Sequence, residues 1–186
     1  SAFETFFPEK RLFFKEGIEV FKTSSKKSAS VLHTRRIGGR PRAPELPEGI
    51  NLSSRQLGSP LDLDAALKVV GSMGKVRYGI LGASEDDVVF DVDDLSITQE
   101  GSEYGVARFL YETKSEAGVY QGVGFISTLS EHPEEDAYVQ GLDYHFLSSQ
   151  GKWKADGQVF YSDTDDDGAG LGGFADITYR PSRRIQ

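Results

Sequence analysis

The sequence contains no cysteine. This absence excludes disulfide bonds, thiolate catalysis and thiolate metal sites. Hydrophobic residues make up only 38% of the chain, and there is one tryptophan, whereas glycine occurs 21 times, phenylalanine 12 times and tyrosine 8 times. This composition favours β-strands separated by glycine-containing turns over a helical bundle.

Long hydrophobic runs are also missing. No run of 18 or more apolar residues occurs, so the sequence predicts no transmembrane helix. The opening residues, Ser1 to Glu4, lack the basic start and the apolar stretch of a signal peptide. Composition alone therefore leaves the compartment open between the cytoplasm, a processed mature form and a fragment.

Positive charge is scarce after residue 60. Residues 1–60 carry 11 Lys/Arg against 6 Asp/Glu, a net charge of +5, whereas the remainder carries a net charge of -13. The acidic bulk argues against a nucleic-acid partner, because neutralising phosphates requires concentrated positive charge. The basic residues lie among Pro and Gly, so residues 1–60 are predicted to form an irregular, basic, Phe-rich entry segment.

From about residue 61 to 186 the pattern predicts a long-strand, antiparallel, up-and-down β-meander. Gly and Asp stand at the junctions, where turns require positive φ angles. The predicted strands are 103–113, 118–128, 137–147, 152–163 and 171–180, with two more between 61 and 90 that join at residues 72–75.

The predicted strands are near eleven residues long, whereas most soluble strands have about five or six. A tilted strand that crosses a bilayer needs about nine to eleven. In 137–147 one face is largely apolar and the other is small or polar, which is typical of a lipid-facing barrel wall. A soluble sheet with one wet face alternates in the same way. A soluble all-β ligand-binding module is therefore the alternative.

Three motifs, in this order and spacing, point to a family: "FETFFPEKRLFFKEGIEVF" (3–21), "TRRIG" (34–38) and "ALKVVGSMGKVRYGILGA" (66–83). They resemble the DUF5916 family, whose members share an outer-membrane β-barrel region that often follows a family 9 carbohydrate-binding-like domain. Lys15 departs from the pattern, since an apolar residue is expected there. The family's barrel is larger than the strands visible in this sequence can form, so we expect a fragment of a longer sequence.

The resemblance implies a single domain over 1–186: a partial transmembrane β-barrel of the outer-membrane type in a Gram-negative envelope. It implies lipid as the surrounding partner and, from the family's usual neighbour, a carbohydrate ligand. No Gly-x-Ser-x-Gly or His-Glu-x-x-His motif occurs, so we expect a non-enzymatic protein without a cofactor. A third hypothesis is an envelope glycan hydrolase, which needs two carboxyl groups about 5–10 Å apart in a cleft.

The stretch "FFPEKRLFFKEG" (6–17) is predicted to be a strand end that turns at Pro8, directs its charges to a polar lumen and returns its aromatics to the wall. These charges either neutralise one another or bind a ligand. Asp143 and His145 share one face of 137–147 and so can form a polar pair. The candidate ligand-binding residues are Arg11, Glu16, Arg35, Arg36, Asp143 and His145.

Two acidic stretches remain. "DTDDDG" places Asp163, Asp165 and Asp167 at alternate positions, as a calcium loop begins, but Phe174 stands where such a loop needs a bidentate Glu. A solvated hairpin loop is the alternative to a weak Ca²⁺ site. "SEDDVVFDVDDLS" (84–96) carries six acidic residues and is predicted to be a solvated loop.

Overall fold

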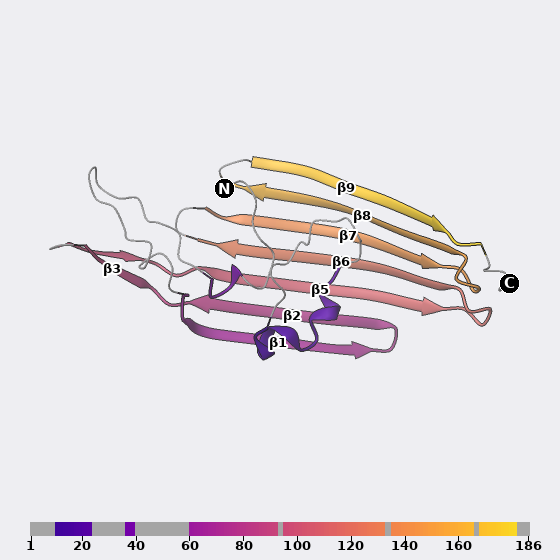
Figure 1. The fold of residues 1–186 in the computed structure, drawn as a ribbon, viewed down its shortest axis with the longest axis horizontal. Helices are drawn as coiled ribbons and strands as arrows, with labels where there is room; N and C mark the ends of the chain where they lie inside the picture. The colour runs from indigo at the N-terminus through magenta and orange to yellow at the C-terminus, as the bar shows by residue number, and fades with distance from the viewer. Residues whose placement is uncertain are drawn as a thin grey trace.

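The computed structural model describes residues 10–23, 36–39, 60–92, 95–132, 135–165 and 168–181. These residues form nine strands and two short helical turns (Figure 1). The helical turns are α1 (Leu12–Lys15) and η1 (Ile18–Val20). The strands are β1 (Leu63–Met73), β2 (Val76–Glu85), β3 (Val88–Val92), β4 (Leu95–Gln99), β5 (Glu103–Lys114), β6 (Tyr120–Glu131), β7 (Ala137–Leu147), β8 (Trp153–Thr164) and β9 (Gly168–Tyr179). In these ranges, no helix has the length and hydropathy needed to cross a bilayer.

Seven strands form one sheet in the order β1-β2-β5-β6-β7-β8-β9, and every neighbouring pair is antiparallel. The strands lie side by side in a single layer (Figure 1). β1 and β9 are the edges, and each has a neighbour on one side only. The predicted all-β antiparallel meander is therefore confirmed, and the described sheet is open.

Tight turns at one end of the sheet depend on glycine. Gly74, between β1 and β2, has a φ of 60° and nothing within 4 Å of the position that a Cβ atom would take. Replacing Gly74 with alanine is expected to lower the free energy of unfolding by about 1 kcal/mol, because only the left-handed backbone conformation is penalised. Gly74→Asn is expected to lose less, since asparagine tolerates this conformation. Chemical denaturation measures both, and equal losses would contradict the explanation.

The sheet has two unlike faces because successive side chains of a strand point to opposite sides. The inner face, as we name the side against which α1 and η1 pack, carries Leu81, Val106 and Ile126 in a buried cluster with Phe14 and Phe21. The outer face, which is the opposite side, carries large apolar side chains that are exposed. They are Leu67, Val69, Met73, Ile80, Phe109, Tyr111, Val123, Phe125, Tyr138, Leu142, Tyr144, Trp153, Val159, Tyr161, Leu171, Ile177 and Tyr179.

The described part of "FFPEKRLFFKEG" is helical, so the prediction of a strand end was wrong. The chain forms α1, turns at Gly17, whose φ is 65°, and continues into η1. Phe14 is 2% exposed and Phe21 is 4% exposed, and both pack on the inner face. Burial of these rings stabilises the helical turns on the sheet, whereas a strand would have directed alternate rings away from it. Pro8 lies outside the described residues.

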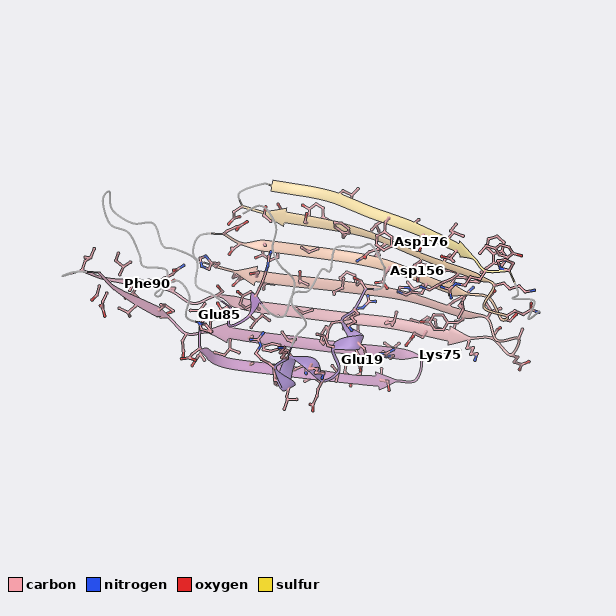
Figure 2. The ribbon with its side chains drawn as sticks, viewed as in Figure 1. Glu19, Lys75, Glu85, Phe90, Asp156 and Asp176 are labelled. Carbon is pink, nitrogen blue, oxygen red and sulfur yellow. The ribbon has the colours of Figure 1, made fainter. Side chains whose placement is uncertain are left out.

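The acidic stretch 84–96 is not a simple loop, which corrects a second prediction. After Glu85 ends β2, the chain forms the antiparallel hairpin β3–β4. Phe90 of β3 faces Ile97 of β4 and is only 2% exposed. The hairpin extends beyond the end of the large sheet (Figures 1 and 2). Val88 and Phe90 alternate with more polar or exposed positions along β3 and give it an apolar side, so the stretch forms a strand although acidic residues surround it.

Candidate functional site

A buried ion pair lies at the centre of the inner face. Arg108 of β5 donates through Nη1 to Asp143 Oδ1 at 2.5 Å and through Nη2 to Asp143 Oδ2 at 2.7 Å. The side chains are 0% and 1% exposed. This is the two-pronged geometry in which a guanidinium binds a carboxylate most strongly. It connects β5 with β7 across the intervening strand β6.

Glycine on β6 provides the space that this ion pair occupies. A Cβ atom at Gly124 would lie 2.5 Å from Arg108 Nη2, 2.6 Å from Asp143 Oδ2 and closer still to Nη1. A Cβ atom at Gly122 would lie 2.9 Å from the Tyr120 hydroxyl. Glycine inside a strand weakens the strand unless something else comes close to its backbone. Here the charged side chains lie directly over the backbone of β6.

His145 extends the network from β7 to β8. Its Nε2 lies 2.6 Å from Asp143 Oδ2, and its Nδ1 lies 2.8 Å from Asp156 Oδ1. The ammonium group of Lys154 forms an ion pair with Asp156 Oδ2. Asp156 and Asp176 are register partners on β8 and β9, and both are labelled in Figure 2. Hydrogen bonds and ion pairs therefore connect charged side chains of three strands, β5, β7 and β8, on the inner face.

A second polar group lies next to this network on the same face. The Tyr120 hydroxyl donates to Glu112 Oε1 at 2.7 Å, and Arg77 Nη1 lies 3.4 Å from Glu112 Oε2. Gly122 separates the two groups, because it is the register partner of both Glu112 and His145. The inner face is thus polar and charged near the short-turn end of the sheet.

The helical segment contacts the network directly. Arg108 Nε donates to the carbonyl oxygen of Val20 at 3.3 Å. The ring of Phe21 lies over Gly79, where a Cβ atom would be 2.7 Å from Cζ. Lys68 of β1 donates to the Phe13 carbonyl oxygen, which anchors α1 to the sheet. The segment at 10–23 is therefore fixed to the inner face by both hydrogen bonds and ring packing.

The structure divides the predicted ligand-binding residues into two groups. Asp143 and His145 form the polar pair that alternation predicts. Arg11 instead donates to the Ile37 carbonyl oxygen at 2.6 Å and lies 4.3 Å from the centre of the Phe14 ring. Arg11 thus contributes to packing of the helical segment.

Of the other three residues of that set, the structure describes Glu16 and Arg36. The Glu16 carbonyl oxygen accepts a hydrogen bond from Lys68 at 2.5 Å, and the Glu16 side chain is exposed. Arg36 is exposed on the short stretch 36–39, and Arg35 lies outside the described residues. A role for any of these residues in ligand binding stays a prediction.

The candidate calcium loop is only partly described. Asp163 accepts a hydrogen bond from the Tyr161 hydroxyl at 3.1 Å, and Asp165 Oδ2 accepts one from the Asp136 backbone at 3.2 Å. Asp167 lies outside the described residues. Among the residues that the structure places, no group of three or more His, Asp or Glu side chains is arranged to hold a metal ion.

Sequence reasoning missed Arg108, Lys154 and Asp156. One usable signal was present, because Arg108 stands between Val106 and Leu110 on the buried side of β5, where an unpaired charge is very unfavourable. Gly122 and Gly124 on the neighbouring strand were a second signal, because glycine inside a strand often marks a place where another group lies close to the backbone. Which carboxylate completes the pair depends on strand register, which the sequence does not specify.

In the comparison with family models, residues 1–180 match a domain of unknown function, DUF5916. The chain belongs to the DUF5916 family. The match includes all nine described strands and the helical segment, so this part of the DUF5916 domain combines an antiparallel sheet with a segment packed on its inner face. No curated protein and no solved structure matches the chain.

Proposed function

We propose that this DUF5916 chain forms part of the wall of a transmembrane β-barrel in the bacterial outer membrane, with the outer face against lipid. The observation that carries the proposal is the distribution of polarity between the two faces. Large apolar side chains are exposed, whereas Arg108, Asp143 and Asp156 are buried on the inner face. A water-soluble sheet buries its apolar face, and a barrel wall in lipid has the reverse arrangement.

The outer face has the further features of a membrane-spanning wall. Its charged side chains lie only near strand ends within the described strands, as at Glu103, Glu131 and Asp163. The ring centres of Trp153 and Tyr179 lie 4.5 Å apart near the short-turn end of the sheet, with the ring planes tilted by 36°. Aromatic residues at the boundaries of an apolar band are typical of outer-membrane barrels. The strands of the large sheet have 10–12 residues, enough to cross a bilayer when tilted.

Seven strands are fewer than the eight of the smallest membrane barrels. Unpaired backbone groups are costly in lipid. The proposal is therefore for a wall segment whose edges, β1 and β9, pair with further strands. The helical segment at 10–23 then lies on the lumen side. A carbohydrate ligand stays a prediction that rests on the family resemblance.

The single tryptophan of the chain allows a direct test. Trp153 is 49% exposed on the outer face. We expect its fluorescence to be quenched when the protein is reconstituted in bilayers whose acyl chains carry bromine, because quenching requires contact with the chains. A matched control is the double variant W153F/F160W, which moves the tryptophan to the inner face of the same strand, where bromine should quench it far less.

The alternative of a soluble ligand-binding module makes the opposite prediction. It requires a monodisperse monomer in detergent-free buffer, with Trp153 accessible to an aqueous quencher and unaffected by brominated lipid. That outcome would overturn the membrane proposal. Migration that is faster before heating than after heating, in a denaturing gel, would support a folded barrel wall.

A further inference from the structure

His145 has a carboxylate at each of its two ring nitrogens. Nε2 lies 2.6 Å from Asp143 Oδ2 and Nδ1 lies 2.8 Å from Asp156 Oδ1. An ionised carboxylate only accepts hydrogen bonds, so each contact requires a hydrogen on the facing nitrogen. We propose that His145 is held as a doubly protonated imidazolium, and that Asp143, His145 and Asp156 form a pH-sensitive clamp between β7 and β8.

The cations around the clamp decide where the proton resides. A neutral imidazole could also form both hydrogen bonds if one of the two aspartates were protonated and donated to the ring. Asp143, however, is bound by both arms of Arg108, and Asp156 is paired with Lys154. Each carboxylate therefore has its own cation that keeps it ionised, and the additional proton stays on the ring.

The remaining groups that face the clamp fit this assignment. Two aspartates, Arg108 and Lys154 sum to zero charge, and a protonated His145 adds one positive charge. Asp176, the register partner of Asp156, supplies a negative charge on the same face. Among the described residues, the titratable or carbonyl groups near the clamp include Arg108 and Glu112 from β5, Tyr120 from β6, Lys154 from β8, Asp176 from β9 and the Val20 carbonyl from the helical segment.

Loss of the proton breaks the clamp on one side. A neutral imidazole retains one N–H, so its other nitrogen directs a lone pair at a carboxylate oxygen less than 3 Å away. Asp143 is fixed by Arg108 and by the close fit over Gly124. Asp156 is the freer partner, because its cation, Lys154, is 44% exposed. We therefore expect the contact between His145 and Asp156 to open as the pH rises.

Because of the clamp, the stability of the contact between β7 and β8 depends on the pH of the water that reaches the inner face. Its contribution to stability is present while His145 is protonated and is lost as the proton dissociates at higher pH. This inference rests on the geometry of the inner face alone. It holds whether the outer face contacts lipid, detergent or protein.

The test is to observe the ring nitrogens of the folded chain by NMR after labelling its three histidines with ¹⁵N. We expect one histidine to show two protonated nitrogens at pH 7, and we expect this signal to be absent in H145Q. In D156N the asparagine can donate to Nδ1, so the same histidine should become neutral at pH 7. This second variant also identifies the signal if H145Q does not fold.

Two outcomes would overturn the inference. One is a His145 ring with a single protonated nitrogen at pH 7 in the unchanged protein. The other is a D156N variant whose His145 remains doubly protonated, because the second carboxylate would then not be what holds the proton. As a readout of the clamp itself, the stability advantage of the unchanged protein over H145Q should shrink as the pH is raised from about 6 to about 9.

Discussion

Replacing Arg108 with leucine is expected to lower the free energy of unfolding by about 3–5 kcal/mol, the typical cost of removing one partner of a buried ion pair. The guanidinium is fully buried and binds both oxygens of Asp143. Without it, the Asp143 carboxylate stays in a site from which water is excluded. The donor to the Val20 carbonyl oxygen is lost as well. Denaturant titration of the folded protein, in the detergent or buffer that keeps it folded, measures the loss.

Arg77→Leu is the matched control for this prediction. Arg77 also pairs with a carboxylate on the inner face, but its contact to Glu112 is 3.4 Å long and its side chain is 37% exposed. Exposed pairs contribute about 0–1 kcal/mol. If Arg77→Leu destabilises the protein as much as Arg108→Leu, the buried ion pair does not hold the sheet together. Adding Asp143→Asn to Arg108→Leu should restore part of the loss by removing the buried carboxylate that no longer has its guanidinium partner.

Leu142→Arg is expected to destabilise the protein by about 2–4 kcal/mol in a bilayer, the cost of an arginine near the middle of a lipid-facing strand. Leu142 lies in the middle of β7, between Phe125 and Val159 on the neighbouring strands, and is 54% exposed. If water covered this face, the same substitution would change stability by only about 0.5 kcal/mol in either direction. Unfolding from lipid vesicles by denaturant gives the measurement.

Gln121→Arg provides the comparison at a different depth. Gln121 is exposed on the same face, one residue from the end of β6 that adjoins a short turn. The cost of a lipid-facing arginine falls to about 0–1 kcal/mol near the interface. If Leu142→Arg and Gln121→Arg lower the free energy of unfolding by similar small amounts, lipid does not cover the outer face, and the membrane proposal is wrong.

Strand positions were the most predictable part of the fold. The strand predicted at 137–147 coincides with β7, and the prediction of 152–163 differs from β8 by one residue at each end. Alternating polarity and glycine-containing turns are local signals, so the sequence alone was sufficient. The β3–β4 hairpin was missed because the six acidic residues of the stretch 84–96 hid the apolar alternation that buries Phe90.

The helical segment was harder to predict. Four phenylalanines in 6–17 indicated an apolar surface but not the conformation that would use it. The positive φ of Gly17 and the space over Gly79 decide that Phe14 and Phe21 lie on the inner face. That space exists only after β2 has paired with its neighbours, so it could not be recognised from the segment itself.

The sequence by itself determined an antiparallel meander of long strands, the division of the strand at 137–147 into an apolar and a polar side, and membership of the DUF5916 family. These follow from a repeat of two residues and from local motifs. Only the tertiary structure decided that the polar side is the covered one and that Arg108, Asp143, His145 and Asp156 meet there. The physical reason is register: these residues come from three strands of the sheet, and their contacts depend on how β5 to β8 align across the glycines of β6.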